Sequence, residues 1–354
     1  MNLTVEITHQ IKHIQADKTF TLDVQVSLPV NNHVVGVFGA SGAGKSTLLK
    51  LIAGIGQAKH KQIIYQSENI SDLLPEHSPC CYQNQQGFLF PHLTVKQNLA
   101  LIITHGHFSA TLPFSMDEVI QWCQLTPLLS QSVSTLSGGE IQRIAFARSL
   151  LSGKSLLLLD EPFSALDWQA REQMLGLIPW LNTRYKIGFI IVSHSLRELS
   201  LVASYITLLK QGKVVEQGLS NELITRISAV QSQQAISALQ GEVVERLEEY
   251  QLMKVLLNGE TSQTVTVHAK DMVSDNIQLS ISANKVSLSK NKPSMTSIVN
   301  LLEVTVCKIE RFPSHSLVTL ALNQQFLLAE ISLMSLDKLE LTLNERVYAQ
   351  FKVL

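Results

Sequence analysis

Residues 39–47 read GASGAGKST, a full match to the pattern G-x-x-x-x-G-K-[ST]. The apolar, β-branched run His33–Phe38 comes before it. Glycines allow consecutive backbone N–H groups to surround a phosphate, and the start of a helix adds a partial positive charge. The pattern therefore predicts a strand, a phosphate-binding loop and then a helix that Gly54 ends, with a buried stripe formed by Leu48, Leu49, Leu51 and Ile52.

The side chains of this loop have separate expected tasks. Lys45 should reach the β and γ phosphates of a nucleotide, Ser46 should place its hydroxyl on Mg²⁺, and Thr47 should support the α-phosphate side. An ordinary glycine-rich turn is the alternative, but it does not explain why strand, lysine and hydroxyl occur together. The candidate nucleotide contacts are Gly39, Ala40, Ser41, Gly42, Ala43, Gly44, Lys45, Ser46 and Thr47.

An acidic pair follows a second apolar run, LLLLDEP at 156–162. A buried strand there brings Asp160 to its carboxyl end, where ligands bind in open α/β sheets. Asp160 is expected to hold Mg²⁺, and Glu161 to act as the general base that activates water. Two solvated acids at a strand end are the alternative, which the phosphate-binding loop makes the weaker one.

Residues 136–140 read LSGGE and begin a helix. Ser137, Gly138 and Gly139 form a second anion-ready helix start, with a hydroxyl, a flexible backbone and free N–H groups. One subunit cannot easily direct both helix starts at one nucleotide, which favours a head-to-tail homodimer with two shared ATP sites. In isolation, the motif is also explained as a helix N-cap with two glycines.

The loop GASGAGKST, the motif LSGGE and the segment LLLLDEPFSALD occur in the order and spacing of the ABC transporter ATPases, which this chain resembles. The resemblance implies that Ser164–Asp167 is the D-loop, that Asp167 lies near a partner subunit, and that His194 senses the γ phosphate. A loop histidine without that role is the alternative for His194. The resemblance also implies that Gln85, four residues before Leu89, links Mg²⁺ to the membrane partner, although Gln83 and Gln86 are close by.

Two features depart from the family pattern. Residues 59–80 lack the glycine that usually marks a hairpin turn there. No aromatic residue upstream of Gly39 is clearly placed to stack on adenine; Phe20 is nearest, but it belongs to the alternating strand 20–28, which favours a core role. The resemblance further implies a helical subdomain over about 92–136 that couples to a permease.

The composition is that of a folded chain with a large core. The chain has 354 residues, 45% hydrophobic and 16% charged, which predicts about two domains. The net charge of −1 gives no argument for a nucleic-acid partner. No signal peptide and no membrane-spanning apolar run is visible, so at a membrane another chain must supply the spanning part. Without metal spacing, four cysteines are expected to be reduced thiols in the cytosol: Cys80, Cys81, Cys123 and Cys307.

The predicted fold is an α/β P-loop NTPase domain of ABC type with a helical subdomain, followed by a small all-β, OB-like domain. Its predicted bounds are 1–228 for the ATPase domain, 229–288 for a connector with a first β lobe, and 289–354 for a Mop/TOBE-like domain. Residues 229–240 are expected to be helical or loose. A weak internal repeat relates 243–259 to 306–323. Strands are expected at 205–209, 264–268, 277–281, 302–306, 317–322, 326–331 and 347–353. The first of these, with a turn at Gln211-Gly212 and Val214-Val215 after it, is expected to form a hairpin.

Three features resemble the ATP-binding subunits of molybdate importers: SLP at 27–29 with LFPHLTV and 191–214, the C-terminal β domain, and TSIVNLLEVTV at 296–306. In the last, Ser297 and Asn300 are candidate oxyanion contacts, and ordinary turn chemistry is the alternative. Lys285 stands where an Asp is usual, which weakens any site that needs that carboxylate.

The resemblance implies a subunit that binds ATP and Mg²⁺ and powers molybdate import. Its expected partners are a second copy, integral membrane permease subunits and, through them, an external molybdate-binding protein; its expected location is the cytoplasmic face of the cell membrane. The alternatives are an importer ATPase for tungstate, sulfate, iron or a sugar, a soluble non-transport ABC ATPase, and an oxyanion-binding regulator that uses ATP structurally.

Overall fold

The computed structural model describes residues 2–12, 19–31, 33–105, 112–231, 235–259, 262–269 and 275–354. The chain forms two compact units, an N-terminal unit Met1–Gln217 and a C-terminal unit Gly218–Leu354. The sequence predicted that the ATPase domain ends at residue 228, whereas the N-terminal unit ends at Gln217. In the described part of the chain, no helix is both long and apolar enough to span a membrane.

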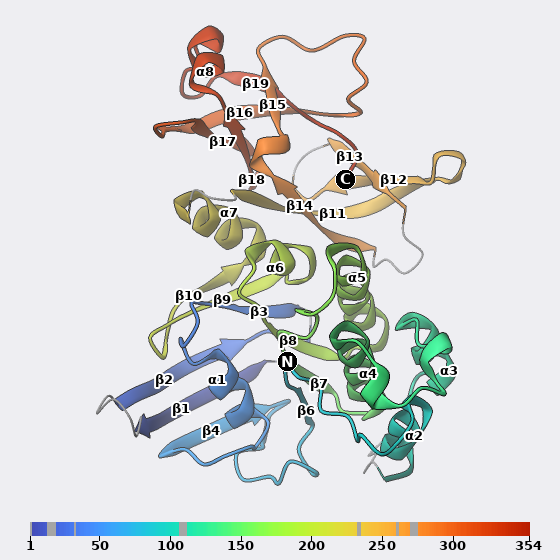
Figure 1. Ribbon diagram of the computed structural model, residues 1–354. Helices are drawn as coiled ribbons and strands as arrows, with labels where there is room; N and C mark the ends of the chain where they lie inside the picture. Colours follow the sequence, from blue (N-terminus) through green and yellow to red (C-terminus); the bar gives the residue numbers. More distant parts are fainter. Residues whose placement is uncertain are drawn as a thin grey trace. The chain divides into compact units, whose positions relative to one another are not determined.

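The larger sheet of the N-terminal unit has the strand order β10-β9-β3-β8-β7-β6 (Figure 1). All residues of β3, β7 and β8 are buried, as expected for parallel strands covered on both faces. β10 (Lys213–Leu219) follows β9 through Gln211 and Gly212, both at positive φ, so the predicted hairpin is confirmed. The parallel strands are β3 (Val34–Phe38), β6 (Cys80–Gln83), β7 (Leu156–Asp160), β8 (Gly188–Val192) and β9 (Tyr205–Lys210).

Helices cover this sheet. α1 (Lys45–Ile52) contacts β6 and β7, and its buried stripe is the predicted one. α5 (Trp168–Tyr185) and α6 (Leu196–Val202) contact β3. Alternate strand residues belong to the core around α1, among them Leu156, Leu158, Ile190 and Val192.

The smaller sheet of this unit is antiparallel, in the order β2-β1-β4-β5. Its strands are β1 (Leu3–Lys12), β2 (Thr19–Leu28), β4 (His60–Tyr65) and β5 (Glu68–Asn69). The predicted alternation along β2 is confirmed, since Leu22, Val24, Val26 and Leu28 are buried. β4 and β5 form a hairpin without the glycine: Gln66 and Ser67 take φ values of 53° and 70° instead.

Three helices gather on one side of this unit in Figure 1: α2 (Val95–His105), α3 (Met116–Trp122) and α4 (Gly138–Leu151). α4 contacts both α2 and α3. Two short 3₁₀ helices, Thr126–Leu128 and Val133–Thr135, lead to α4. The helical region predicted over about 92–136 thus contains α2 and α3, and its residues 106–111 lie outside the described part of the chain.

The C-terminal unit begins with α7 (Ser220–Gln231) and contains two sheets, β13-β12-β11-β14 and β15-β19-β16-β17-β18. One apolar core joins both sheets. The strands are β11 (Ile236–Leu247), β12 (Leu252–Leu257), β13 (Thr264–His268), β14 (Asn276–Ser282), β15 (Ser287–Ser289), β16 (Asn300–Arg311), β17 (Ser316–Leu322), β18 (Gln325–Ile331) and β19 (Arg346–Phe351). The predicted OB-like, all-β character is confirmed; the helix α8 (Leu333–Leu339) and the strands β12 and β15 were not predicted.

The expectation for 229–240 was wrong at its end, because β11 begins at Ile236. Ile236, Ser237 and Ala238 are all buried. Packing in the core therefore overrides the weak β propensity of Ala and Ser. Residues 232–234 of that stretch lie outside the described residues. The internal repeat has a structural counterpart: β11–β12 shifts register between Val243 and Glu245, and β16–β17 shifts between Val306 and Lys308, the matching positions.

Candidate functional site

The phosphate-binding loop joins β3 to α1, and its backbone needs its glycines. Gly42 and Gly44 have φ values of 77° and 100°, in the region that residues with a Cβ seldom adopt. At Gly39 a Cβ would collide with the carbonyl oxygen of Leu209. Gly44 also caps α1 without a side-chain bond, which leaves the first N–H groups of the helix available to an anion.

Lys45 lies inside this loop and is 7% exposed. Its ammonium donates hydrogen bonds to the carbonyl oxygens of Gly39 at 2.7 Å and Ala40 at 2.9 Å. Burial lowers the pKa of Lys45, while the charges of Glu161 and Asp160 act to raise it. The ammonium therefore lies near two carboxylates. A bound phosphate would replace the loop carbonyls as the hydrogen-bond acceptor of Lys45.

Asp160 ends β7 and is 6% exposed. Its Oδ2 accepts a hydrogen bond at 3.0 Å from the hydroxyl of Tyr82 on the neighbouring strand β6. Burial, together with the Asp160 charge and this hydrogen bond, raises the pKa of Tyr82, so that the phenol stays a donor. The sequence interpretation missed Tyr82; parallel β6 sets Tyr82 opposite Leu158 of β7, a register that only the sheet reveals.

Glu161 is held from two sides. Its Oε1 lies 3.2 Å from Nδ1 of His194, and its Oε2 accepts a hydrogen bond from Nε2 of Gln85 at 3.0 Å. Its backbone has a φ of 46°, an unfavourable conformation for a residue with a side chain, and its N–H donates to Val192 O at 3.0 Å. Of the glutamines near this position, Gln85 is the one whose amide reaches the acidic pair, while Gln83 is buried on β6.

The donor set suits Mg²⁺, which prefers oxygen ligands and few protein carboxylates. Asp160 offers a carboxylate fixed by Tyr82, Ser46 offers an exposed hydroxyl, and Gln85 offers an amide oxygen. Thr47, next in the loop, is half-buried. Ser46, Gln85 and Asp160 therefore stay the predicted metal contacts.

The signature segment begins α4. Ser137 is the N-cap and forms a capping box with Glu140, in which both the N–H and the hydroxyl of Ser137 lie 2.7 Å from Glu140 Oε2. These hydrogen bonds lower the pKa of Glu140. Ser137 and Gly138 are exposed, whereas Gly139 is buried against Leu166, where a Cβ would come within 2.8 Å of that side chain. The exposed helix start can therefore meet an anion from outside this unit.

Gln142, on the first turns of α4, is a second residue that the sequence interpretation missed. Its Nε2 donates to Gln85 O at 3.0 Å and to Ser164 Oγ at 3.1 Å, and its Oε1 accepts from Ala165 N at 2.8 Å. One buried amide thus ties the signature helix to Gln85 and to the D-loop segment, which ends at Asp167, the N-cap of α5. A polar residue on the buried face of α4 was the signal available in the sequence.

In the C-terminal unit, the candidate oxyanion residues have different environments. Asn300 is 1% exposed, and its amide accepts from Thr266 N at 2.6 Å and donates to Thr266 O at 3.0 Å and Lys352 O at 3.1 Å. Ser297 is exposed. This geometry supports the alternative of structural hydrogen bonding for Asn300, because its amide is already occupied.

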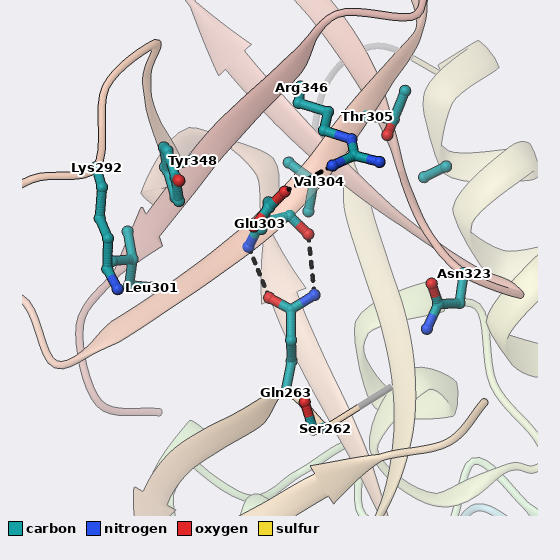
Figure 2. Close-up of a pocket in the computed structure, with 11 residues that line it drawn as sticks. Ser262, Gln263, Lys292, Leu301, Glu303, Val304, Thr305, Asn323, Arg346 and Tyr348 are labelled. Carbon is teal, nitrogen blue, oxygen red and sulfur yellow. Dashed lines mark hydrogen bonds and ion pairs between the residues drawn. The ribbon is translucent and has the colours of Figure 1, made fainter. Parts of the chain in front are cut away.

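Figure 2 shows a hollow of about 780 Å³ in the same unit. The side chain of Gln263 pairs with the backbone of Glu303 across it, through Glu303 O at 2.9 Å and Glu303 N at 2.6 Å. Arg346 lies 3.6 Å from the Glu303 carboxylate. The described residues that line the hollow do not include Ser297 or Asn300.

A parallel sheet that delivers a glycine-rich loop and an acidic pair to one edge, with a serine-capped signature helix beside it, defines the class of ABC-type nucleoside triphosphatases. Residues 23–164 match the family model of the ABC transporter, and residues 296–353 match that of the TOBE domain. A solved dimeric ATP-binding cassette, MJ0796, bound to ADP and Pi, aligns with a TM-score of 0.54 and 23% identity over 62% of this chain and 98% of its own. That likeness supports the fold of the N-terminal unit.

Proteins named molybdenum import ATP-binding protein ModC resemble the chain along nearly its whole length. The protein of Hahella chejuensis is 34% identical over 94% of each chain. That of Brucella melitensis is 34% identical over 93% of this chain and 92% of its own, and that of Vibrio vulnificus is 32% identical over the same shares. The chain belongs to this family of molybdenum import ATP-binding proteins of ABC transporters.

Proposed function

We propose that this chain binds and hydrolyses ATP to drive the import of molybdate across the cytoplasmic membrane. The observation that carries the hydrolytic part is Glu161, held between His194 and Gln85 at the edge where Lys45 lies. The assignment of molybdate as the cargo rests on the relatives. The similarity to proteins named for molybdenum import extends over both units of the chain.

In this proposal the phosphate-binding loop and Lys45 hold the β and γ phosphates, and Glu161 accepts the proton of the attacking water. His194 orients Glu161 and stabilises charge on the γ phosphate, and Gln85 fixes the other carboxylate oxygen. Asp160, Ser46 and Gln85 would hold Mg²⁺, whose charge would offset the negative charge of the phosphates. Tyr82 holds Asp160 in the orientation that this role requires.

The exposed Ser137 and Gly138 support a head-to-tail homodimer, in which the signature segment of one copy meets the nucleotide of the other. In a closed two-fold dimer, the phosphate-binding loop and the signature segment of each copy both belong to the shared interface. Integral membrane permease subunits are the proposed further partners, and they receive molybdate from an external binding protein. The chain would act as a peripheral subunit on the cytoplasmic face of the membrane.

The test is Glu161→Gln. The amide keeps the size of the side chain but cannot accept a proton, so kcat should fall by about 10²–10⁴-fold while ATP binding is retained. The variant should also accumulate as an ATP-bound dimer in size-exclusion chromatography. Normal turnover in Glu161→Gln would remove Glu161 as the base, and monomeric ATP-bound protein would remove the shared-site dimer.

A further inference from the structure

Two segments next to the acidic pair are joined by side chains that the proposed chemistry does not use. The D-loop segment is Ser164–Asp167, which leads into α5, and the switch segment is Ser193–Ser195, which carries His194 and leads into α6. α5 and α6 contact one another. The side chains in question come from the first turns of these two helices.

Arg171, on the first turns of α5, holds the D-loop segment and reaches the other helix. Its Nη2 donates to the carbonyl oxygens of Ser164 at 2.8 Å and Leu166 at 2.6 Å, and its Nη1 donates to Glu198 Oε1 at 2.8 Å. The side chain is 21% exposed. A planar guanidinium can form such a fork, whereas a lysine ammonium lacks its fixed geometry.

Glu198 continues the connection into the switch segment. Its Oε2 accepts a hydrogen bond from the hydroxyl of Ser193 at 2.7 Å, and the same hydroxyl oxygen accepts from Ser195 N at 2.9 Å. Glu198 Oε1 is the acceptor of Arg171. The residues on both sides of His194 are therefore tied, through one carboxylate, to the carbonyls of the D-loop segment.

A second contact joins the first turns of the helices that follow these segments. The Arg197 guanidinium lies over the Trp168 ring, 3.7 Å from its centroid. Trp168 directly follows Asp167, and Arg197 is on the first turn of α6. A cation over an aromatic face at this distance is attractive. This second contact joins the starts of α5 and α6, the helices that directly follow the two segments.

We propose that Arg171 and Glu198 are positioning residues that make the D-loop segment and the switch segment move as one body. The inference rests on the proposed ATP hydrolysis, and it adds a physical connection from the D-loop segment to His194. A partner that presses on Ser164–Asp167 shifts the Ser164 and Leu166 carbonyls, Arg171 follows, and Glu198 with Ser193 carries the shift to His194. His194 in turn contacts Glu161, so dimer contact and the orientation of the base are coupled.

The pair also stabilises the fold, since breaking a largely buried ion pair leaves an uncompensated charge. A loss of activity alone would therefore not separate the two roles. Arg171→Met, Arg171→Lys, Glu198→Gln and the double variant should be assayed for kcat and KM for ATP, for nucleotide affinity with a fluorescent ATP analogue, and for amide hydrogen exchange. Arg184→Met is the matched control, an exposed arginine in the last turn of α5.

For Arg171→Met we expect kcat to fall at least about tenfold with KM and nucleotide affinity within twofold of the wild type, because the phosphate-binding loop is untouched. Arg171→Lys should be intermediate. The double variant Arg171→Met with Glu198→Gln should be no worse than the worse single variant, since both changes cut one connection. Arg184→Met should behave as the wild type.

Hydrogen exchange gives the readout that a purely structural role would not move. Arg171→Met should increase exchange at residues 193–195 as well as at 164–167, although the guanidinium of Arg171 donates its hydrogen bonds to the latter segment and to Glu198. Unchanged exchange at 193–195, additive losses in the double variant, or a kcat loss that matches the lost fraction of nucleotide-binding protein would overturn the proposal. A wild-type chain without ATP turnover would instead overturn the proposed function.

Discussion

The acidic edge of the N-terminal unit and the Asn300 region of the C-terminal unit both present polar residues where a strand ends or begins. At the acidic edge the carboxylate of Glu161 is held by two side chains, and His194 beside it is 65% exposed. Around Asn300, backbone groups of Thr266 and Lys352 occupy the whole amide. The difference teaches that a motif residue is available for a ligand only if its hydrogen-bonding groups are not already used by the fold.

The two regions also differ in backbone strain. Glu161 has a φ of 46°, in a region that costs a residue with a Cβ about 1–2 kcal/mol. Asn300 lies in regular pairing with Phe351 of β19. Strain at the proposed base and regular pairing at Asn300 agree with a chemical role for the first and a structural role for the second.

The largest effect is expected on ATP turnover when the acidic pair Asp160 and Glu161 is changed. Asp160→Asn should lower kcat for ATP by about 10²–10³-fold, because a neutral amide attracts Mg²⁺ less than a carboxylate does, although its oxygen can still accept the hydrogen bond from Tyr82. EDTA should abolish turnover of the wild type, and Mg²⁺ should restore it. Steady-state ATPase assays measure both.

Asp337→Asn is the control for this substitution, because Asp337 is exposed in the C-terminal unit, where its carboxylate lies 2.9 Å from the exposed Arg311. It should leave kcat within twofold. Full turnover by Asp160→Asn would contradict the assignment of the metal site.

A smaller effect, on stability, is expected at Asn300. Asn300→Ala would leave Thr266 N–H, Thr266 O and Lys352 O without their partner, and should lower the free energy of unfolding by about 2–4 kcal/mol. Ser297→Ala, at an exposed position, should change it by less than about 0.5 kcal/mol. Urea unfolding followed by fluorescence measures both. Equal, small changes would contradict the structural role and return Asn300 to consideration as an oxyanion ligand.

The smallest effect is expected in the β4–β5 hairpin. Ser67→Gly should raise the free energy of unfolding by about 0.5–1 kcal/mol, since Ser67 has a φ of 70° that glycine adopts without strain. Ser71→Gly is the matched control with the opposite sign, because the Ser71 hydroxyl accepts a hydrogen bond from Ile63 N at 2.8 Å. Destabilisation by Ser67→Gly would show that the turn depends on the serine side chain.

Local patterns in the sequence sufficed for the phosphate-binding loop, the buried strands and most strands of the C-terminal unit. Each of these depends on neighbours in the chain: glycines at fixed spacing, unbroken apolar runs, or alternation. Tyr82 and Arg171 could not be found in this way, and the one signal for Gln142 was its polarity on the buried face of α4. Tyr82 gains its role from parallel register, and Gln142 and Arg171 bind backbone atoms of distant segments.

The start of β11 shows a second limit of local patterns. Residues 236–240 have the composition of a linker, yet they pair with β14, and Ile236, Ala238 and Leu239 among them are buried. Their strand conformation follows from partners that lie far along the chain, so composition misled the prediction. The family resemblance implies Gln85 rather than its neighbouring glutamines, and Nε2 of Gln85 lies 3.0 Å from Glu161 Oε2.

The most direct test of the central claim is the molybdenum content of cells that carry either the native chain or Lys45→Ala, grown on trace molybdate. Loss of the Lys45 ammonium removes the charge that holds the phosphates, so we expect cellular molybdenum to fall while sulfur and iron stay constant. Unchanged molybdenum in the variant, with its ATPase activity abolished, would contradict molybdate as the cargo and leave the chain an ABC ATPase for another substrate.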